Sequence, residues 1–271
     1  MNIAIDIGSF NTTTAVFDGN NKIIDKIQFP TDKLFENFLI SLEKHVVRFL
    51  TIYDIERGIV SISGLLDLSN NFLISTYGLP WHNIPILFNL ENILGFPMIA
   101  QNNTYMATLY ESSMLVKNHS SILYISISNT ISYCFLDVHN ESRKNISPGD
   151  DIMVQKNSGL TKWSELVSGK SVIQNYGKTI REISDKVFWK AYSKNLATGI
   201  WQLNVSYQPD VIIIGGIVGK YYSKYIEDLI YNLDRFSLPI IKFPELIKAH
   251  KPLTNTLYGS IIYLNQYETV K

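Results

Sequence analysis

The first eighteen residues place an acidic side chain and a glycine at the end of an apolar run. Residues 1–5 are mostly apolar and lead into Asp6-Ile7-Gly8, and a polar turn then leads through Thr12 into a second β-rich run that ends at Asp18. This order predicts a hairpin that holds Asp6 beside a nucleotide phosphate, where its carboxylate would bind Mg²⁺ through water. Gly8 would let the backbone approach the phosphate closely. A plain hairpin in which Asp6 caps its turn is the alternative interpretation.

Four other places carry polar groups or glycines where predicted elements end. They are the pair Asn102-Asn103, the segment Ser128-Asn129-Thr130, the loop acid Asp150, and the pair Gly215-Gly216 after an apolar run. Each also has a structural interpretation. The asparagines are good helix N-caps, Asp150 could be a solvated loop acid, and the glycines could simply end a strand. Only their combination indicates a site.

The elements that must position these residues alternate between helical and β patterns. Helical spacing or helix signals cover 33–50, 86–93, 103–117, 163–206 and 257–267, whereas β patterns cover 58–66, 98–100, 121–138 and 210–214. The stretch 140–161 is polar and loop-like. Interleaved strands and helices predict an α/β fold and exclude a helical bundle or a β-sandwich.

Composition narrows the functional class. The chain has 271 residues, enough for two lobes, with 24 basic and 24 acidic side chains and no basic stripe, so we expect no nucleic-acid partner. No apolar run reaches the length needed to span a bilayer, and we expect a cytoplasmic protein without a membrane partner. A single cysteine, Cys134, and the lack of a Cys/His cluster predict no zinc site.

In their order and spacing, these segments resemble the ROK family of sugar kinases and repressors, within the actin-like ATPase superfamily. The resemblance rests on Asp6-Ile7-Gly8, Asn102-Asn103 and Gly215-Gly216, and on the segments 79–85, 94–98 and 257–260. It implies an α/β, two-lobed actin-like ATPase (ribonuclease H-like) fold with a central cleft, in which ATP phosphorylates a hexose-like sugar. The opening also resembles type III pantothenate kinases, but residues 79–111 fit the ROK pattern much better.

The resemblance also assigns roles to single residues. Asn102, Gly64 and Asp150 would contact the sugar, and Asn103 stands where the family carries its base. The nucleotide and its phosphates would be bound by a larger set: Asp6, Gly8, Thr12, Ser128, Asn129, Thr130, Gly215 and Gly216. The implied lobes are 1–103 with 256–271, and 104–255. The family often forms dimers, so a homodimer is expected.

The chain departs from the family pattern at the positions that do the chemistry. Asn103 replaces the Asp that accepts the sugar proton, and a neutral amide cannot act as a carboxylate base. Ser128 to Ser132 has lost every glycine of the second phosphate segment. Met153 stands where the sugar-binding segment of the family carries His. In the first turn, Phe10 stands where the family carries a small hydroxyl residue. The cysteine-rich zinc loop of the family is missing. We therefore expect a degenerate sugar-kinase homologue that is weak or inactive and keeps a cleft for binding or regulation.

The alternative is an active kinase of a hexose or related sugar that depends on ATP and Mg²⁺. It would place Asp6 near the metal and use Asp150 as a surrogate acid or base. Positioning and charge stabilisation supply most of phosphoryl-transfer catalysis, so a missing base need not abolish turnover.

Overall fold

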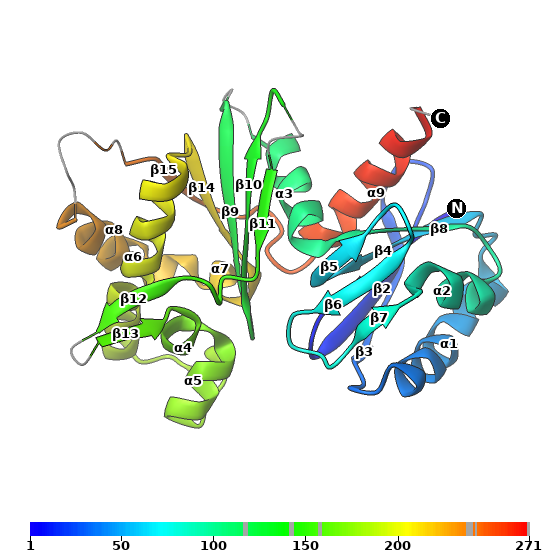
Figure 1. Cartoon of the computed structure of the whole chain (residues 1–271), viewed down its shortest axis with the longest axis horizontal. Coiled ribbons are helices and arrows are strands. Elements are labelled where there is room, and N and C mark those ends of the chain that lie inside the picture. The colour runs from blue at the N-terminus through cyan, green and yellow to red at the C-terminus, as the bar shows by residue number, and fades with distance from the viewer. Residues whose placement is uncertain (116–118, 141–143, 157–158, 237–240, 242, 270–271) are drawn as a thin grey trace. The chain divides into compact units, whose positions relative to one another are not determined.

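The computed structural model describes residues 1–115, 119–140, 144–156, 159–236, 241 and 243–269 (Figure 1). Two compact units divide the chain. Unit 1 comprises Met1–Tyr110 and Thr254–Lys271, and unit 2 comprises Glu111–Leu253. Each contains a five-stranded mixed sheet with helices, which confirms the predicted α/β class. The lobe boundaries expected from the sequence, at 103/104 and 255/256, stay a prediction.

The large sheet of unit 1 has the order β3-β2-β1-β4-β8. The three strands β1, β2 and β3 pair antiparallel, whereas β1, β4 and β8 pair parallel. Their bounds are β1 Asn2–Ile7, β2 Asn11–Phe17, β3 Ile23–Pro30, β4 Arg57–Ile62 and β8 Met98–Asn102. The predicted first hairpin is therefore confirmed as β1 and β2.

Helices cover both faces of this sheet. Alternate residues of β1, Ile3 and Ile5, point into the core shared with α1 (Phe35–Ile52) and α2 (Ile86–Leu94). Helix α1 buries Phe38, Leu42, Val46 and Phe49, a spacing that puts one apolar stripe on the sheet. Helix α9 (Asn255–Thr269) packs against β1 and β4, away from α1 and α2 (Figure 1).

A small antiparallel sheet, β5-β6-β7, completes unit 1 together with helix α3. Its strands are β5 Gly64–Asp67, β6 Phe72–Thr76 and β7 His82–Ile84, and α3 spans Asn103–Ser113. Helix α2 ends at Gly95, whose left-handed φ of 81° suits a residue without a Cβ. Helix α3 follows β8 directly, so Asn102 and Asn103 lie at a strand-to-helix junction.

The large sheet of unit 2 has the order β11-β10-β9-β14-β15, again with antiparallel and parallel halves. Its strands are β9 Ser121–Ile127, β10 Ile131–Asp137, β11 Lys144–Ser147, β14 Val211–Gly215 and β15 Glu245–Lys248. All five residues of β14 are buried, as expected of a continuous apolar strand inside a parallel region.

The other elements of unit 2 are a hairpin and a set of helices. They are β12 Met153–Lys156, β13 Gly159–Lys162, α4 Ser164–Val167, α5 Gly169–Tyr176, η1 Ile180–Glu182, α6 Lys186–Tyr207, α7 Gly216–Lys220, η2 Tyr222–Lys224 and α8 Ile226–Asp234. Helix α6 begins at the cap Asp185, whose carboxylate accepts the Val187 N–H at 2.8 Å. Trp163, Trp189 and Leu196 belong to one buried core with β9 and β14.

The two large sheets share one topology, a duplication that the sequence did not reveal. Strands β1, β2, β3, β4 and β8 correspond in order and direction to β9, β10, β11, β14 and β15. The turn between β1 and β2 therefore corresponds to the turn between β9 and β10. This correspondence allows the two phosphate-facing segments expected from the sequence to be compared directly.

Several predicted elements need correction. The single strand expected over 58–66 is two strands, β4 and β5, and the polar stretch 140–161 contains β11, β12 and the start of β13. The helical stretch 163–206 is divided into α4, α5, η1 and α6 because Ser168 and Gly177 end helical turns. The helix expected over 103–117 ends at Ser113, and residues 116 and 117 lie outside the described residues. No helix among the described residues is long and apolar enough to cross a membrane.

Candidate functional site

Asp6 lies one residue before the end of β1, with Asn103 beside it. The Asn103 side-chain amide donates to Asp6 Oδ1 at 3.5 Å, the long end of a hydrogen bond. Burial raises the pKa of Asp6 to about 7, and the hydrogen bond from Asn103 partly opposes that shift. Near neutral pH this carboxyl group is therefore divided between its protonated and ionised forms.

The turn after Asp6 is closed by Gly8, whose N–H donates to the Asn11 carbonyl at 3.1 Å. Phe10 is half exposed, whereas Thr12 is fully buried. The Thr12 hydroxyl lies 2.9 Å from the Thr31 hydroxyl, so a partner inside unit 1 already engages it. The predicted contact between Thr12 and a phosphate stays a prediction.

Asn102 is buried at the junction of β8 and α3 and uses its whole side chain within unit 1. Its Oδ1 accepts the N–H groups of Thr104 and Tyr105 at 2.8 and 3.2 Å, as the N-cap interpretation expected. Its Nδ2 donates to the Gly64 carbonyl at 3.0 Å. A Cβ on Gly64 would overlap the Ser75 carbonyl, so tight packing between β5 and β6 requires this glycine.

In unit 2, the segment Ser128 to Thr130 forms the tight turn between β9 and β10. The Ser128 N–H donates to the Thr130 carbonyl at 2.9 Å. The Ser128 hydroxyl accepts the Ile217 N–H at 3.1 Å, within α7. The carbonyls of Ser128 and Asn129 accept the Gly169 and Lys170 N–H groups of α5, at 2.6 and 3.2 Å. Backbone donors of two helices are thus directed at this turn and satisfied by it.

The pair Gly215-Gly216 follows β14 and enters α7. Gly216 has a left-handed φ of 70°, and a Cβ there would lie 2.5 Å from the Ile127 carbonyl oxygen. A Cβ on Gly215 would overlap the Tyr124 hydroxyl. Both glycines are therefore explained by close packing, and they bring α7 against the Ser128 turn.

Asp150 is exposed, and its neighbour Asp151 makes the specific contacts. Ser147 and Tyr133 donate their hydroxyls to Asp151 Oδ2 at 2.7 and 3.2 Å. Burial raises the pKa of Tyr133 above its usual value, so the phenol keeps its proton as a donor. Sequence reasoning favoured Asp150 and had no signal for Asp151, because both acids lie in one polar loop. Only the antiparallel pairing of Tyr133 with Ser147 brings its partners together.

The described residues contain no group of three or more His, Cys, Asp and Glu side chains placed to hold a metal ion. Mg²⁺ does not need three protein ligands, because it commonly binds one or two carboxylates together with substrate phosphates and water. A single partly buried carboxyl group, that of Asp6, is compatible with this mode of binding. Cys134, the single cysteine of the chain, is buried.

Comparison with known proteins gives one family and one fold. Residues 2–132 match the sequence model of the ROK family, and none of the curated proteins compared with the chain matches it. A ROK family glucokinase from Streptomyces griseus, solved with glucose and AMPPNP, has a TM-score of 0.81 at 14% identity, over 98% of this chain and 99% of the other.

Two further structures agree. A ROK hexokinase from Thermus thermophilus has a TM-score of 0.69 at 20% identity, over 98% of this chain and 99% of the other. A ROK family protein from Streptococcus pneumoniae TIGR4, solved with sucrose, has a TM-score of 0.76 at 19% identity, over 100% of this chain and 99% of the other. The predicted resemblance is thereby confirmed: residues 2–132 match the ROK family model, and the chain has the actin-like fold of ROK sugar kinases along nearly its whole length.

Proposed function

We propose that the protein is a sugar-kinase homologue with little or no phosphoryl transfer, which retains sugar or nucleotide binding for a regulatory role. The observation that carries this proposal is the Ser128 turn. In the ROK pattern this position is a glycine, whereas here the Ser128 hydroxyl accepts the Ile217 N–H at 3.1 Å. The side chain thus occupies a backbone donor and adds a Cβ where a phosphate would need close approach.

The contact between Asn103 and Asp6 supports the same proposal. An amide at position 103 donates to Asp6, whereas the Asp of the family pattern would bring two carboxyl groups together and raise the pKa of one of them. Asn103 keeps the local arrangement hydrogen bonded but cannot take a proton from a sugar hydroxyl. A lost general base typically lowers a rate by about 10²–10⁴-fold.

The proposed binding role uses residues from both units. We assign Asn102 and Gly64 to the wall of a sugar site, with Asp150 or its hydrogen-bonded neighbour Asp151 as the acid facing the sugar. Gly215 and Gly216 would lie beside the adenosine of ATP, and Asp6 would hold Mg²⁺ through water. The glucose- and sucrose-bound relatives named above support a sugar as the ligand class.

An active, ATP-dependent kinase of a hexose or related sugar is the second candidate. The observation that favours it is a pair of hydrogen bonds in unit 1, from Asn103 to Asp6 and from Asn102 to the Gly64 carbonyl, which hold these polar groups in place. Phosphoryl transfer depends mainly on positioning and charge stabilisation, so this arrangement could sustain turnover without a carboxylate at position 103.

The deciding experiment measures ADP release from Mg·ATP with a panel of hexoses, amino-sugars and N-acetyl-sugars. The wild type, Asp6→Ala and Asn103→Asp are compared, after circular dichroism has shown each to be folded. We expect no sugar-dependent ADP release from any of the three proteins, because Asn103→Asp leaves the Ser128 turn unchanged. Sugar-dependent release by the wild type that disappears in Asp6→Ala would establish the active kinase. Robust sugar-dependent ADP release by Asn103→Asp, but not by the other two proteins, would show that the Ser128 turn can bind the phosphates of ATP.

Binding is measured separately by calorimetry with each sugar and with Mg·ADP. Binding of a sugar without turnover is the expected result. If neither Mg·ADP nor any of the sugars binds, the proposal of a retained binding site is wrong. If Mg·ADP binds tightly, the proposal that Ser128 impairs phosphate binding is wrong.

A further inference from the structure

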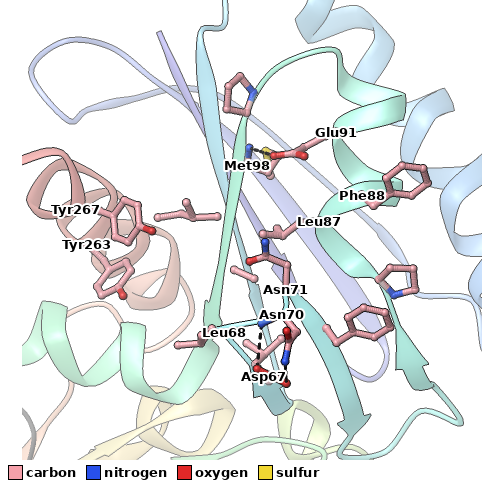
Figure 2. A pocket seen from close by; sticks show the side chains of 16 residues that line it. Asp67, Leu68, Asn70, Asn71, Leu87, Phe88, Glu91, Met98, Tyr263 and Tyr267 are labelled. Carbon is pink, nitrogen blue, oxygen red and sulfur yellow. Dashed lines mark hydrogen bonds between the residues drawn. The ribbon is translucent and has the colours of Figure 1, made fainter. Parts of the chain in front are cut away.

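A pocket of about 700 Å³ lies in unit 1, lined by residues to which the proposed function assigns no role (Figure 2). Its walls come from the turn between β5 and β6, from α2, from strand β8, and from the last turns of α9. Figure 2 shows Tyr263 and Tyr267 on one side of β8 and Phe88 and Glu91 on the other. A volume of this size matches that of small-molecule sites, which typically occupy about 300–1,000 Å³.

Aromatic and aliphatic side chains supply much of the lining. Phe88 is 66% exposed and Leu68 51%, unusually open for residues of their kind. Tyr263 and Tyr267 stand with ring centroids 6.3 Å apart, on successive turns of α9. Their ring faces carry negative charge density, which attracts cations.

Both charged residues in the lining are acids. Of the sixteen residues that line the pocket, Asp67 and Glu91 carry charge, and none is lysine, arginine or histidine. The amide of Asn70 and the N–H groups of Asn70 and Ser69 lower the pKa of Asp67, so this carboxylate is ionised at neutral pH. Glu91 uses Oε1 to accept the Met98 N–H at 2.9 Å. The pocket thus has a net negative charge beside aromatic rings.

The floor of the pocket is the free edge of β8. Because the Pro97 carbonyl accepts the Gly58 N–H, Met98, Ala100 and Asn102 direct their backbone groups away from β4. Glu91 caps the Met98 N–H, and the Gln101 side chain accepts the Asn102 N–H at 2.9 Å. Ala100 lies between these capped positions and lines the pocket.

We propose that this pocket binds a small organic cation, an ammonium or guanidinium group carried on an aromatic or apolar body. The cationic group would lie against Glu91, and the apolar body would lie along the aromatic and aliphatic lining that includes Tyr267. Asp67, toward the other end of the lining, would add to the negative charge of the pocket (Figure 2). An extended peptide fits less well, because strand addition needs a row of open edge donors. Side chains of this chain already cap two of the three outward N–H groups of β8.

The test uses benzylamine as the cationic probe, with benzyl alcohol and benzoate as matched neutral and anionic probes. Binding is followed by two-dimensional NMR through the amide signal of Ala100 and the ring signals of Tyr263 and Tyr267. We expect benzylamine to shift these signals with a millimolar Kd, as suits so small a ligand. Benzyl alcohol and benzoate should bind at least about fivefold more weakly, and added salt should weaken benzylamine binding.

Glu91→Gln is the decisive variant, because glutamine keeps an oxygen acceptor for the Met98 N–H and removes the charge. We expect about a fivefold weaker affinity for benzylamine, which corresponds to about 1 kcal/mol. Glu43→Gln, on the exposed face of α1, is the matched control and should leave the affinity unchanged. Tyr267→Leu should also weaken binding by removing a ring face.

Three results would overturn the proposal. They are equal binding of benzylamine and benzyl alcohol, equal effects of Glu91→Gln and Glu43→Gln, and the lack of any shift at about 10 mM benzylamine in protein whose melting shows it to be folded. The site does not depend on the proposed function. Asp6→Ala should leave benzylamine binding unchanged even if every sugar experiment fails.

Discussion

Two turns occupy corresponding places in the two large sheets, one between β1 and β2 and the other between β9 and β10. They differ in the residue that closes them. Both are closed by a backbone bond, from the Gly8 N–H to the Asn11 carbonyl and from the Ser128 N–H to the Thr130 carbonyl. In unit 1 the closing residue is a glycine. In unit 2 it is a serine whose hydroxyl binds the backbone of α7.

This difference shows how a duplicated fold can keep its shape while its chemistry changes. Antiparallel pairing fixes each turn from both sides, so a glycine or a serine can close it. Unit 1 retains a carboxyl group, that of Asp6, next to its turn. In unit 2 the Ser128 hydroxyl accepts the Ile217 N–H, a donor that our proposal would otherwise offer to a ligand. Fold and site are therefore separable within each hairpin.

The largest expected effect concerns Asp6 and pH, in buffer without Mg²⁺. Folding raises the pKa of Asp6 from 3.8 to about 7, so between these values the folded state binds more protons than the unfolded state. The contribution of Asp6 to the free energy of unfolding is fully present below about pH 4 and is lost as the pH rises to about 7. The loss is at most about 1.4 kcal/mol per pH unit.

Asp6→Asn should remove this pH dependence, because asparagine does not titrate and can still accept from Asn103. Urea unfolding at several pH values between 4 and 7 measures it, with wild type and variant side by side. If the free energy of unfolding changes with pH in the same way for both proteins, the raised pKa of Asp6 in the folded state is contradicted.

Gly216→Ala should have the next largest effect. A Cβ at this left-handed position would lie 2.5 Å from the Ile127 carbonyl oxygen and 2.7 Å from the Ser128 hydroxyl. We expect unit 2 to lose roughly 2–3 kcal/mol of its free energy of unfolding, through backbone strain and crowding of the turn. Thermal or urea unfolding measures this loss. A change below about 0.5 kcal/mol would show that the backbone of the turn can shift to accommodate the Cβ.

Ser128→Gly sharpens the comparison by giving unit 2 the residue type of unit 1. The variant loses the hydrogen bond from the Ile217 N–H to the serine oxygen, so the free energy of unfolding should fall by about 1 kcal/mol. The Ile217 N–H then becomes available to a ligand. Binding of Mg·ADP, measured by calorimetry, should tighten. Ser9→Gly, in the corresponding turn of unit 1, is the control and should not tighten it. Unchanged Mg·ADP affinity in Ser128→Gly would mean that Ser128 does not limit access.

Gly8→Ala should have the smallest effect. A Cβ on Gly8 would meet only the Asn11 carbonyl oxygen, at 3.0 Å, and no left-handed φ is required there. We expect a loss below about 1 kcal/mol in urea unfolding. A loss as large as that of Gly216→Ala would show that the two turns are equally intolerant of a side chain.

Element types followed from local patterns where the pattern is strong. The helix α1 and the apolar run of β14 were predicted, and the Asn102 cap was one of the two interpretations left open, because spacing, burial and capping chemistry are local properties. Short strands were missed. The hairpin of β12 and β13 lies in a polar stretch, and its pairing is fixed by contacts along the two strands and not by composition.

The sequence by itself determined the resemblance to the ROK family, the α/β class, and the residue types at positions 103 and 128 on which the proposed loss of activity rests, because these depend on which side chains are present. Only the tertiary structure decided which partners those side chains meet. It bonds Asn103 to Asp6, gives the Ser128 hydroxyl to Ile217, and selects Asp151 over Asp150 as the acid held by Tyr133 and Ser147. Except for the contact between Ser147 and Asp151, which are four residues apart, these contacts join segments far apart in the chain, and sheet pairing sets such distances where residue order alone does not.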